Sequence, residues 1–265
     1  MSSRRFHTRR INELVLGVML SMFMIPLGWG GSSGPWNSTA LPGTIRGIRI
    51  HYEYDREASF PASWLESPIN CEGSQVEISE AERVVPLIEE FAVTYGDSTL
   101  HDHLTDIYLL GSLSCYGKMY GGTNSTSAIY IRVSPESQGY DAHYLLSTLH
   151  AEFSSILWRQ HRFPIEEWQG MNPPGFEYAN DSVAVLDVPG ITDQPSPEMF
   201  CGGFLTRYAA SDLEDDFNEY AGAIFTEPKQ LCEYRVRCKA IADKAWLAIE
   251  FYKSVDPGIK VPPCN

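Results

Sequence analysis

Residues 149–157 (LHAEFSSIL) contain a glutamate that could act as the general base in metal-dependent hydrolysis. The sequence motif His-Glu-x-x-His on a helix places two imidazoles on one helix face and a general-base glutamate beside the first. Glu152 occupies the position of that base. The two ligand positions hold Ala151 and Ser155, and neither a methyl group nor a neutral hydroxyl is a usual zinc ligand. In this frame Glu152 is the candidate catalytic residue, and both helix ligands are missing.

Other histidines cannot complete a site on this helix alone. His150 is adjacent to the empty position, and its own i+4 partner is Ser154. His143 and His161 lie about 10 Å and about 16 Å from His150 along a helix axis, whereas zinc–nitrogen bonds are about 2 Å long. His150 therefore remains a candidate metal ligand only in a set completed from other elements.

Further patterns carry weaker signals. Acidic residues within 212–219 lie at the start of a predicted helix, where they complement the positive end of its dipole. The pair His101-x-His103 is more typical of surface residues than of a metal site. There is no CxxC pair for a zinc knuckle, and Ser147, Ser154 and Ser155 show no GxSxG elbow for a serine hydrolase.

Composition narrows the class of protein. The chain has 265 residues, with 20 Lys and Arg against 34 Asp and Glu, and a net charge of −14. An acidic surface repels phosphate, so we expect no nucleic-acid partner. Apolar residues make up 43% of the sequence, an ordinary fraction for a globular protein.

The N-terminus has the pattern of a secretory signal peptide. An arginine-rich start precedes an apolar run over 14–29 and a small-residue exit. We predict a signal peptide over 1–33, a linker over 34–43 and a single domain over 44–265. The predicted location is secreted or extracytoplasmic. Contact with a membrane is expected only if the N-terminal segment is retained as an anchor, for which the apolar run is short.

Cysteine and asparagine positions agree with export. All six cysteines follow the signal peptide, and an even number in an exported chain predicts up to three disulfides. Six cysteines allow 15 pairings, and the sequence does not choose among them. Asn37, Asn124 and Asn180 begin glycosylation sequons, which matter only in a host that glycosylates exported proteins.

Periodicity predicts an α+β fold, with a small N-terminal sheet and helices followed by a mostly helical C-terminal half. A capping box at Ser79 and Glu82 would start one helix, and Gly96 would end it. Residues 55–76, 121–126 and 162–205 are predicted to be loops or irregular structure. The predicted strands are 44–54, 106–113 and 127–133, and the predicted helices are 79–95, 141–160, 214–225 and 234–252.

From about residue 143 to 255 the chain resembles secreted bacterial zinc-binding metallopeptidases of the zincin class. The resemblance rests on the words LHAEFSSIL, NPPGFEYA, GFLTRYAASDLEDDFNEYAGAIF and KAIADKAWLAIEFY. It implies a zincin-like fold, zinc as cofactor, Glu152 as base and Glu219 as third ligand. The expected substrate or ligand is a peptide or a cell-envelope protein. Ala151 and Ser155 stand where the family has its histidine ligands.

Three functions follow from these observations. The first is an exported zinc-metallopeptidase-like protein that is catalytically impaired because its helix ligands are lost. The second is an active metallopeptidase with non-standard ligands that include His150 and Glu219. The third is a non-enzymatic secreted module that binds a partner in the former cleft.

Overall fold

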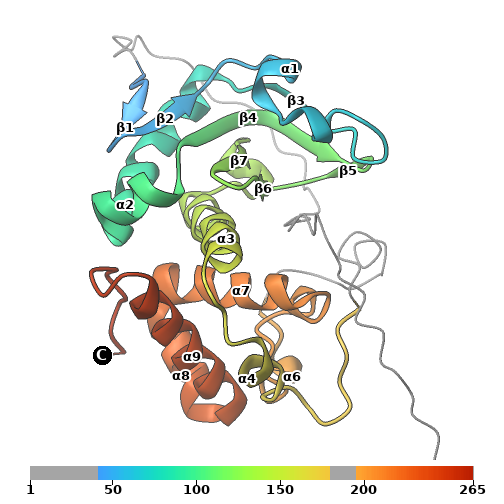
Figure 1. Cartoon of the computed structure of the whole chain (residues 1–265), viewed down its shortest axis with the longest axis vertical. Helices are drawn as coiled ribbons and strands as arrows, with labels where there is room; N and C mark the ends of the chain where they lie inside the picture. The colour runs from blue at the N-terminus through green and yellow to red at the C-terminus, as the bar shows by residue number, and fades with distance from the viewer. Residues whose placement is uncertain (1–40, 180–194, 265) are drawn as a thin grey trace, which may run out of the picture.

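The computed structural model describes residues 41–179 and 195–264 (Figure 1). The predicted signal peptide, most of the predicted linker, and the sequons at Asn37 and Asn180 lie outside the described residues. Within those two ranges, no helix is long and apolar enough to cross a membrane.

A mixed sheet forms the N-terminal half, in the order β1-β2-β4-β7-β6. Its parallel centre is made by β2, β4 and β7, while β1 and β6 pair antiparallel at the two ends. β3 and β5 both pair antiparallel with the long strand β4. The strands are β1 (Thr44–Ile45), β2 (Ile48–His51), β3 (Glu72–Gln75), β4 (Asp106–Cys115), β5 (Lys118–Met119), β6 (Gly122–Asn124) and β7 (Ala128–Arg132).

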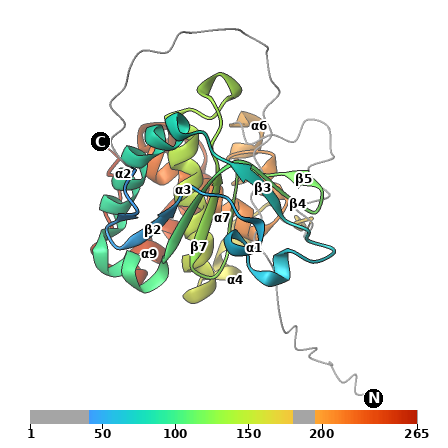
Figure 2. The same ribbon diagram turned by 90° about the horizontal axis from the view of Figure 1, so that it is seen from above.

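Helices make up most of the remainder and confirm the predicted α+β class. α2 and α3 lie side by side against the sheet, and α3 lies between the sheet and α7 (Figures 1 and 2). The helices are α1 (Arg56–Ser59), α2 (Ile78–His103), α3 (Ala142–Gln160), α4 (Ile165–Gln169), α6 (Pro197–Phe200), α7 (Leu213–Thr226), α8 (Pro228–Arg237) and α9 (Lys239–Val255), with short 3₁₀ turns at Ala62–Trp64, Glu136–Gln138 and Tyr208–Ala210.

Backbone turns explain where the predicted elements differ from the structure. The predicted strand 44–54 is a hairpin, because Arg46 and Gly47 adopt positive φ angles and reverse the chain between β1 and β2. Gly96, with φ 79° and ψ 160°, is not helical, so α2 consists of two helical segments that meet at a kink where the sequence predicts the helix to end. The predicted helix 234–252 is divided at Cys238, whose backbone is extended between α8 and α9.

The predicted capping box of α2 is absent, since the helix begins at Ile78 after Glu77 with no side-chain cap. In contrast, Asp141 caps α3 by accepting a hydrogen bond from the backbone N–H of Tyr144. β6 lies in a segment that we predicted to be a loop.

Three disulfides use all six cysteines, as the even count predicts. Cys71–Cys115 joins the segment before β3 to the end of β4. Cys201–Cys238 and Cys232–Cys264 lie in the helical half, where the second ties the C-terminal tail to α8. Each bond closes a loop of 32 to 44 residues, which restricts the unfolded chain and stabilises the fold.

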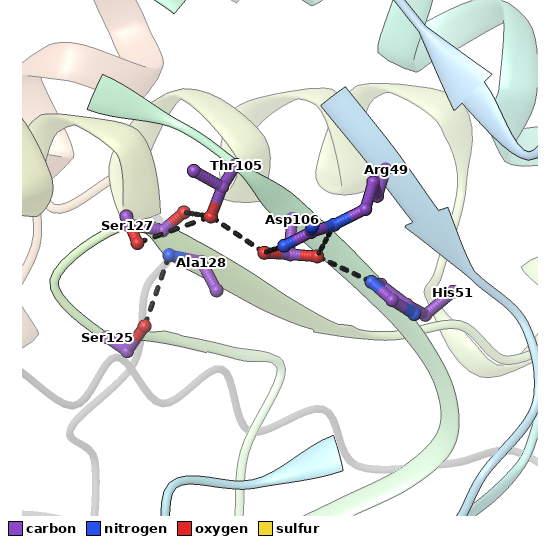
Figure 3. Close-up of polar contacts among 7 residues, drawn as sticks. All are labelled: Arg49, His51, Thr105, Asp106, Ser125, Ser127 and Ala128. Carbon is purple, nitrogen blue, oxygen red and sulfur yellow. Dashed lines mark hydrogen bonds and ion pairs between the residues drawn. The ribbon is translucent and has the colours of Figure 1, made fainter. Parts of the chain in front are cut away.

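Asp106 fixes the start of the parallel pair β2–β4 (Figure 3). Its carboxylate accepts two hydrogen bonds of 2.7 Å from Arg49, one from Thr105, and lies 2.6 Å from His51 Nε2. Burial acts to raise the pKa of Asp106, but the hydrogen bonds and the Arg49 charge outweigh it and lower the pKa below its usual value.

A buried ion pair organises the helical half. Lys244 Nζ of α9 lies 2.6 Å from Asp216 Oδ2 of α7, and both side chains are fully buried. The same oxygen accepts hydrogen bonds from Trp168 and Tyr178. Buried charges are tolerated only when they are paired and hydrogen-bonded, so these contacts hold α7, α9 and the 164–178 segment in one arrangement.

α3 and α7 approach each other closely at Gly222. A Cβ atom at Gly222 of α7 would overlap Ser147 Oγ of α3 but would lie 3.7 Å from Ser147 Cβ, an ordinary van der Waals distance. A side chain at position 222 would therefore have to displace the Ser147 hydroxyl.

We expect Gly222→Ala to lower the free energy of unfolding by about 1–3 kcal/mol, the usual cost of overpacking. Ser147→Ala should have a small effect alone and should restore most of the loss in the double variant, because the overlapping atom is Oγ. Chemical denaturation of the four proteins measures this. A double variant no more stable than Gly222→Ala would contradict the packing interpretation.

Candidate functional site

A cavity of about 340 Å³ opens beside the α3–α7 contact. The N-terminal half of α3 forms one wall, and α7 with the start of α8 forms the opposite wall. The remaining lining comes from Gly139, Pro195, Leu205 and Thr206.

The structure brings two of the motif positions to this cavity. Ala151 of α3 and Glu219 of α7 both line it. Ser155 lies one turn further along α3, where its Oγ accepts a 2.7 Å hydrogen bond from Asn218, the neighbour of Glu219. The helix positions that hold zinc ligands in the resembling family thus meet the segment that contains Glu219.

His150 lies elsewhere, in an aromatic cluster away from the cavity lining. Its ring stacks on Phe225 at a centroid distance of 4.6 Å, and its Nδ1 lies 3.0 Å from the hydroxyl of Tyr95. Burial lowers the pKa of His150 to about 3, so the ring is neutral at physiological pH. Its assignment as a metal ligand stays a prediction, and this position gives it a clear packing role.

Glu152 is completely buried between α3 and the sheet. Asn124 of β6 donates a 2.5 Å hydrogen bond to Glu152 Oε2, whereas Oε1 has no partner among the residues that the structure describes. A Cβ atom at Gly122 would lie 2.6 Å from Oε1, so this strand must have glycine there. Burial is the main cause that raises the pKa of Glu152 well above its usual value.

Asn124 belongs to a buried polar chain that joins three elements. Its Oδ1 accepts a hydrogen bond from Arg159 of α3, which also lies 2.8 Å from Glu214 Oε1 of α7. Glu214 is 3% exposed, and burial raises its pKa to about 7 despite the nearby Arg159 charge. The chain Glu152–Asn124–Arg159–Glu214 stabilises the α3 environment and leaves Glu152 without direct access to the cavity.

The cavity is acidic. Asp141, Glu219 and Glu227 line it, while no Lys or Arg is among its lining residues. His143 lies 3.2 Å from Glu227, and this hydrogen bond is the main cause that raises the His143 pKa. Asn218 Oδ1 is buried without a partner in the described part of the chain. These groups favour a ligand that carries positive charge and hydrogen-bond donors.

The donors at this position do not fit the zinc of the resembling family. Two of the three family ligand positions hold a methyl group and a hydroxyl that already accepts from Asn218. Across 41–179 and 195–264, no group of three or more His, Cys, Asp or Glu residues is arranged to hold a metal ion. Of the family ligands, Glu219 alone is present.

Several residues of this site were not predicted from the sequence. Arg159 and Asn218 had no motif to mark them, and Asn124 had been considered only as a glycosylation site. Asn124 is 2% exposed and its amide is bound to Glu152, so the folded protein offers no acceptor there. Helical spacing could have indicated Asn218, because this residue lies one position before Glu219 and four positions after Glu214.

Comparison with known proteins supports the fold. No protein-family model and no curated protein matches the sequence. Among solved structures, the chain is similar to a "putative zinc-binding metallo-peptidase" from Bacteroides caccae, with a TM-score of 0.52 and 14% identity over 79% of this chain and 80% of that one. This similarity confirms the predicted zincin-like α+β fold.

Glu152→Gln should change the pH dependence of stability. Because burial raises the folded-state pKa of Glu152, its ionisation destabilises the native state as pH rises above about 4.5. Each pH unit between the unfolded and folded pKa values costs about 1.4 kcal/mol. The glutamine can still accept from Asn124, so the variant should lose less stability between pH 5 and pH 8 in urea titrations.

Two variants calibrate this measurement. Glu214→Gln should also flatten the profile, mainly between pH 4.5 and 7, because the Glu214 pKa is about 7. The exposed Glu166→Gln should leave the slope unchanged. A wild-type slope that Glu152→Gln does not alter would contradict a raised pKa at Glu152.

Proposed function

We propose that this chain is an exported metallopeptidase-like protein that has lost zinc-dependent catalysis and holds a basic peptide in the α3–α7 cavity. One observation carries the proposal. Ala151 and Glu219 line the same cavity. Glu152, the base implied by the resemblance, is buried against Gly122 and accepts a hydrogen bond from Asn124.

Loss of catalysis follows from the chemistry of the side chains. A zinc peptidase needs ligands that hold the metal and a carboxylate that reaches its bound water. Here two ligand positions are non-coordinating, and the carboxylate is fully buried. An active version with His150 and Glu219 would require His150 to leave the contacts with Tyr95 and Phe225.

The ligand class follows from the charge of the cavity. Its lining holds three carboxylates and no Lys or Arg, so a lysine- or arginine-containing peptide fits better than an acidic one. A segment of a cell-envelope protein has this chemistry, whereas nucleic acid does not. The three disulfides support an oxidising, extracytoplasmic location.

Restoring the two histidines tests the ancestry of the site. We expect Ala151→His with Ser155→His to create zinc binding, because residues at i and i+4 share a helix face beside Glu219. Equilibrium dialysis with zinc would show one additional equivalent over wild type. Glu219→Gln in the double variant should weaken that binding. A folded double variant that binds no more zinc than wild type would refute the assignment of positions 151 and 155 to the two histidine ligands.

Activity assays test the loss of catalysis. Wild-type protein supplied with zinc should cleave no peptide from a mixed-sequence library, and Glu152→Gln should behave identically. Zinc-dependent cleavage that Glu152→Gln abolishes would overturn the proposal.

Peptide binding tests the proposed ligand. A trilysine peptide should bind more tightly than a triglutamate peptide in calorimetry, and added salt should weaken the interaction. Glu219→Gln should weaken trilysine binding, while the remote Glu166→Gln should not. Equal affinity for both peptides would refute the electrostatic part of the proposal.

A further inference from the structure

Two histidines meet at the far end of α3, away from the cavity. His103 is the last residue of α2, and His161 follows the last residue of α3. Their Nε2 atoms lie 3.3 Å apart, and their ring planes are inclined by 70°. Ten residues separate Ala151 from His161, a rise of about 15 Å along a helix, so this pair is distinct from the candidate site.

The surrounding hydrogen bonds orient His103 as a ligand. Gln160 Nε2 donates to the carbonyl oxygen of Thr126 at 2.7 Å, which turns Gln160 Oε1 toward His103. That oxygen lies 2.6 Å from His103 Nδ1, so Nδ1 carries the proton and donates. In the neutral ring the lone pair is then on Nε2, which points at His161. Metal-binding histidines are commonly oriented in this way by a second hydrogen-bond partner.

The spacing of the two nitrogens matches a shared metal ion. Two zinc–nitrogen bonds of about 2.0–2.1 Å at a tetrahedral angle place the nitrogens about 3.3–3.4 Å apart. The observed separation of 3.3 Å lies at the lower edge of this range. Both side chains are partly exposed, so solvent can reach the position and supply the remaining ligands.

Electrostatics at this position also favour a cation. The pair lies where two helices end, and the C-terminal ends of helix dipoles are partially negative.

We propose that His103 and His161 form a binding site for one divalent transition-metal ion of the zinc or copper class, completed by water. The ion would join the C-terminal ends of α2 and α3. Imidazole suits both metals, and copper(II) should bind more tightly than zinc.

Calorimetric titration of the full chain with zinc and with copper(II) tests the proposal. Wild type should take up one equivalent at this position, and His103→Asn or His161→Asn should weaken binding about tenfold or more. Gln160→Leu removes the hydrogen bond that orients His103 and should weaken binding by about 10–100-fold. Thermal unfolding should shift upward with metal in wild type, and the shift should be smaller in His103→Asn and His161→Asn.

Two control variants test whether the metal binds specifically at His103 and His161. His101→Asn, two residues away and highly exposed, and His143→Asn, at the cavity, should both bind metal as wild type does. Copper(II) electron paramagnetic resonance should show two imidazole nitrogens in wild type and one in either single variant of the pair. No saturable uptake, or uptake unchanged by both His103→Asn and His161→Asn, would overturn the site and leave an ordinary His–His hydrogen bond.

Discussion

The burial of α3 on nearly all sides is the constraint on which the rest of the structure depends. Its residues from Leu145 to Leu157 are buried, apart from Ser147, between the sheet, α2 and α7. A buried polar group without a partner is costly, so each polar side chain on this helix must find one inside the protein. The elements that surround α3 are arranged to provide these partners.

This constraint explains the contacts made by Ser154, Ser155 and Glu152 of α3. Ser154 bonds to Tyr252 of α9, Ser155 accepts from Asn218 of α7, and Glu152 accepts from Asn124 of β6. Each hydrogen bond attaches the helix to a different element. These polar side chains of α3 therefore stabilise its packing, and the small side chain of Ala151 lines the cavity beside them.

The sequence predicted those features that depend on local pattern. α3 was placed to within a residue because its apolar stripe is continuous and Asp141 caps it. The kink of α2 at Gly96 agrees with the predicted helix end. The division at Cys238 was not predicted, because one extended residue between two helices leaves no interruption in the helical pattern of the sequence. Ala151 and Glu219 line the same cavity, whereas spacing along one helix could not reveal that His150 faces an aromatic cluster supplied by α2 and α7.

Fold and catalysis therefore depend on different properties of the same helix. The zincin-like fold needs apolar residues at core positions and partners for buried polar groups, and many sequences meet these requirements, as 14% identity to the similar structure illustrates. Zinc binding needs particular donor atoms at two positions four residues apart. Ala151 and Ser155 meet the packing needs of α3 but supply no usual zinc ligand, so this fold can form without the donor atoms that zinc requires.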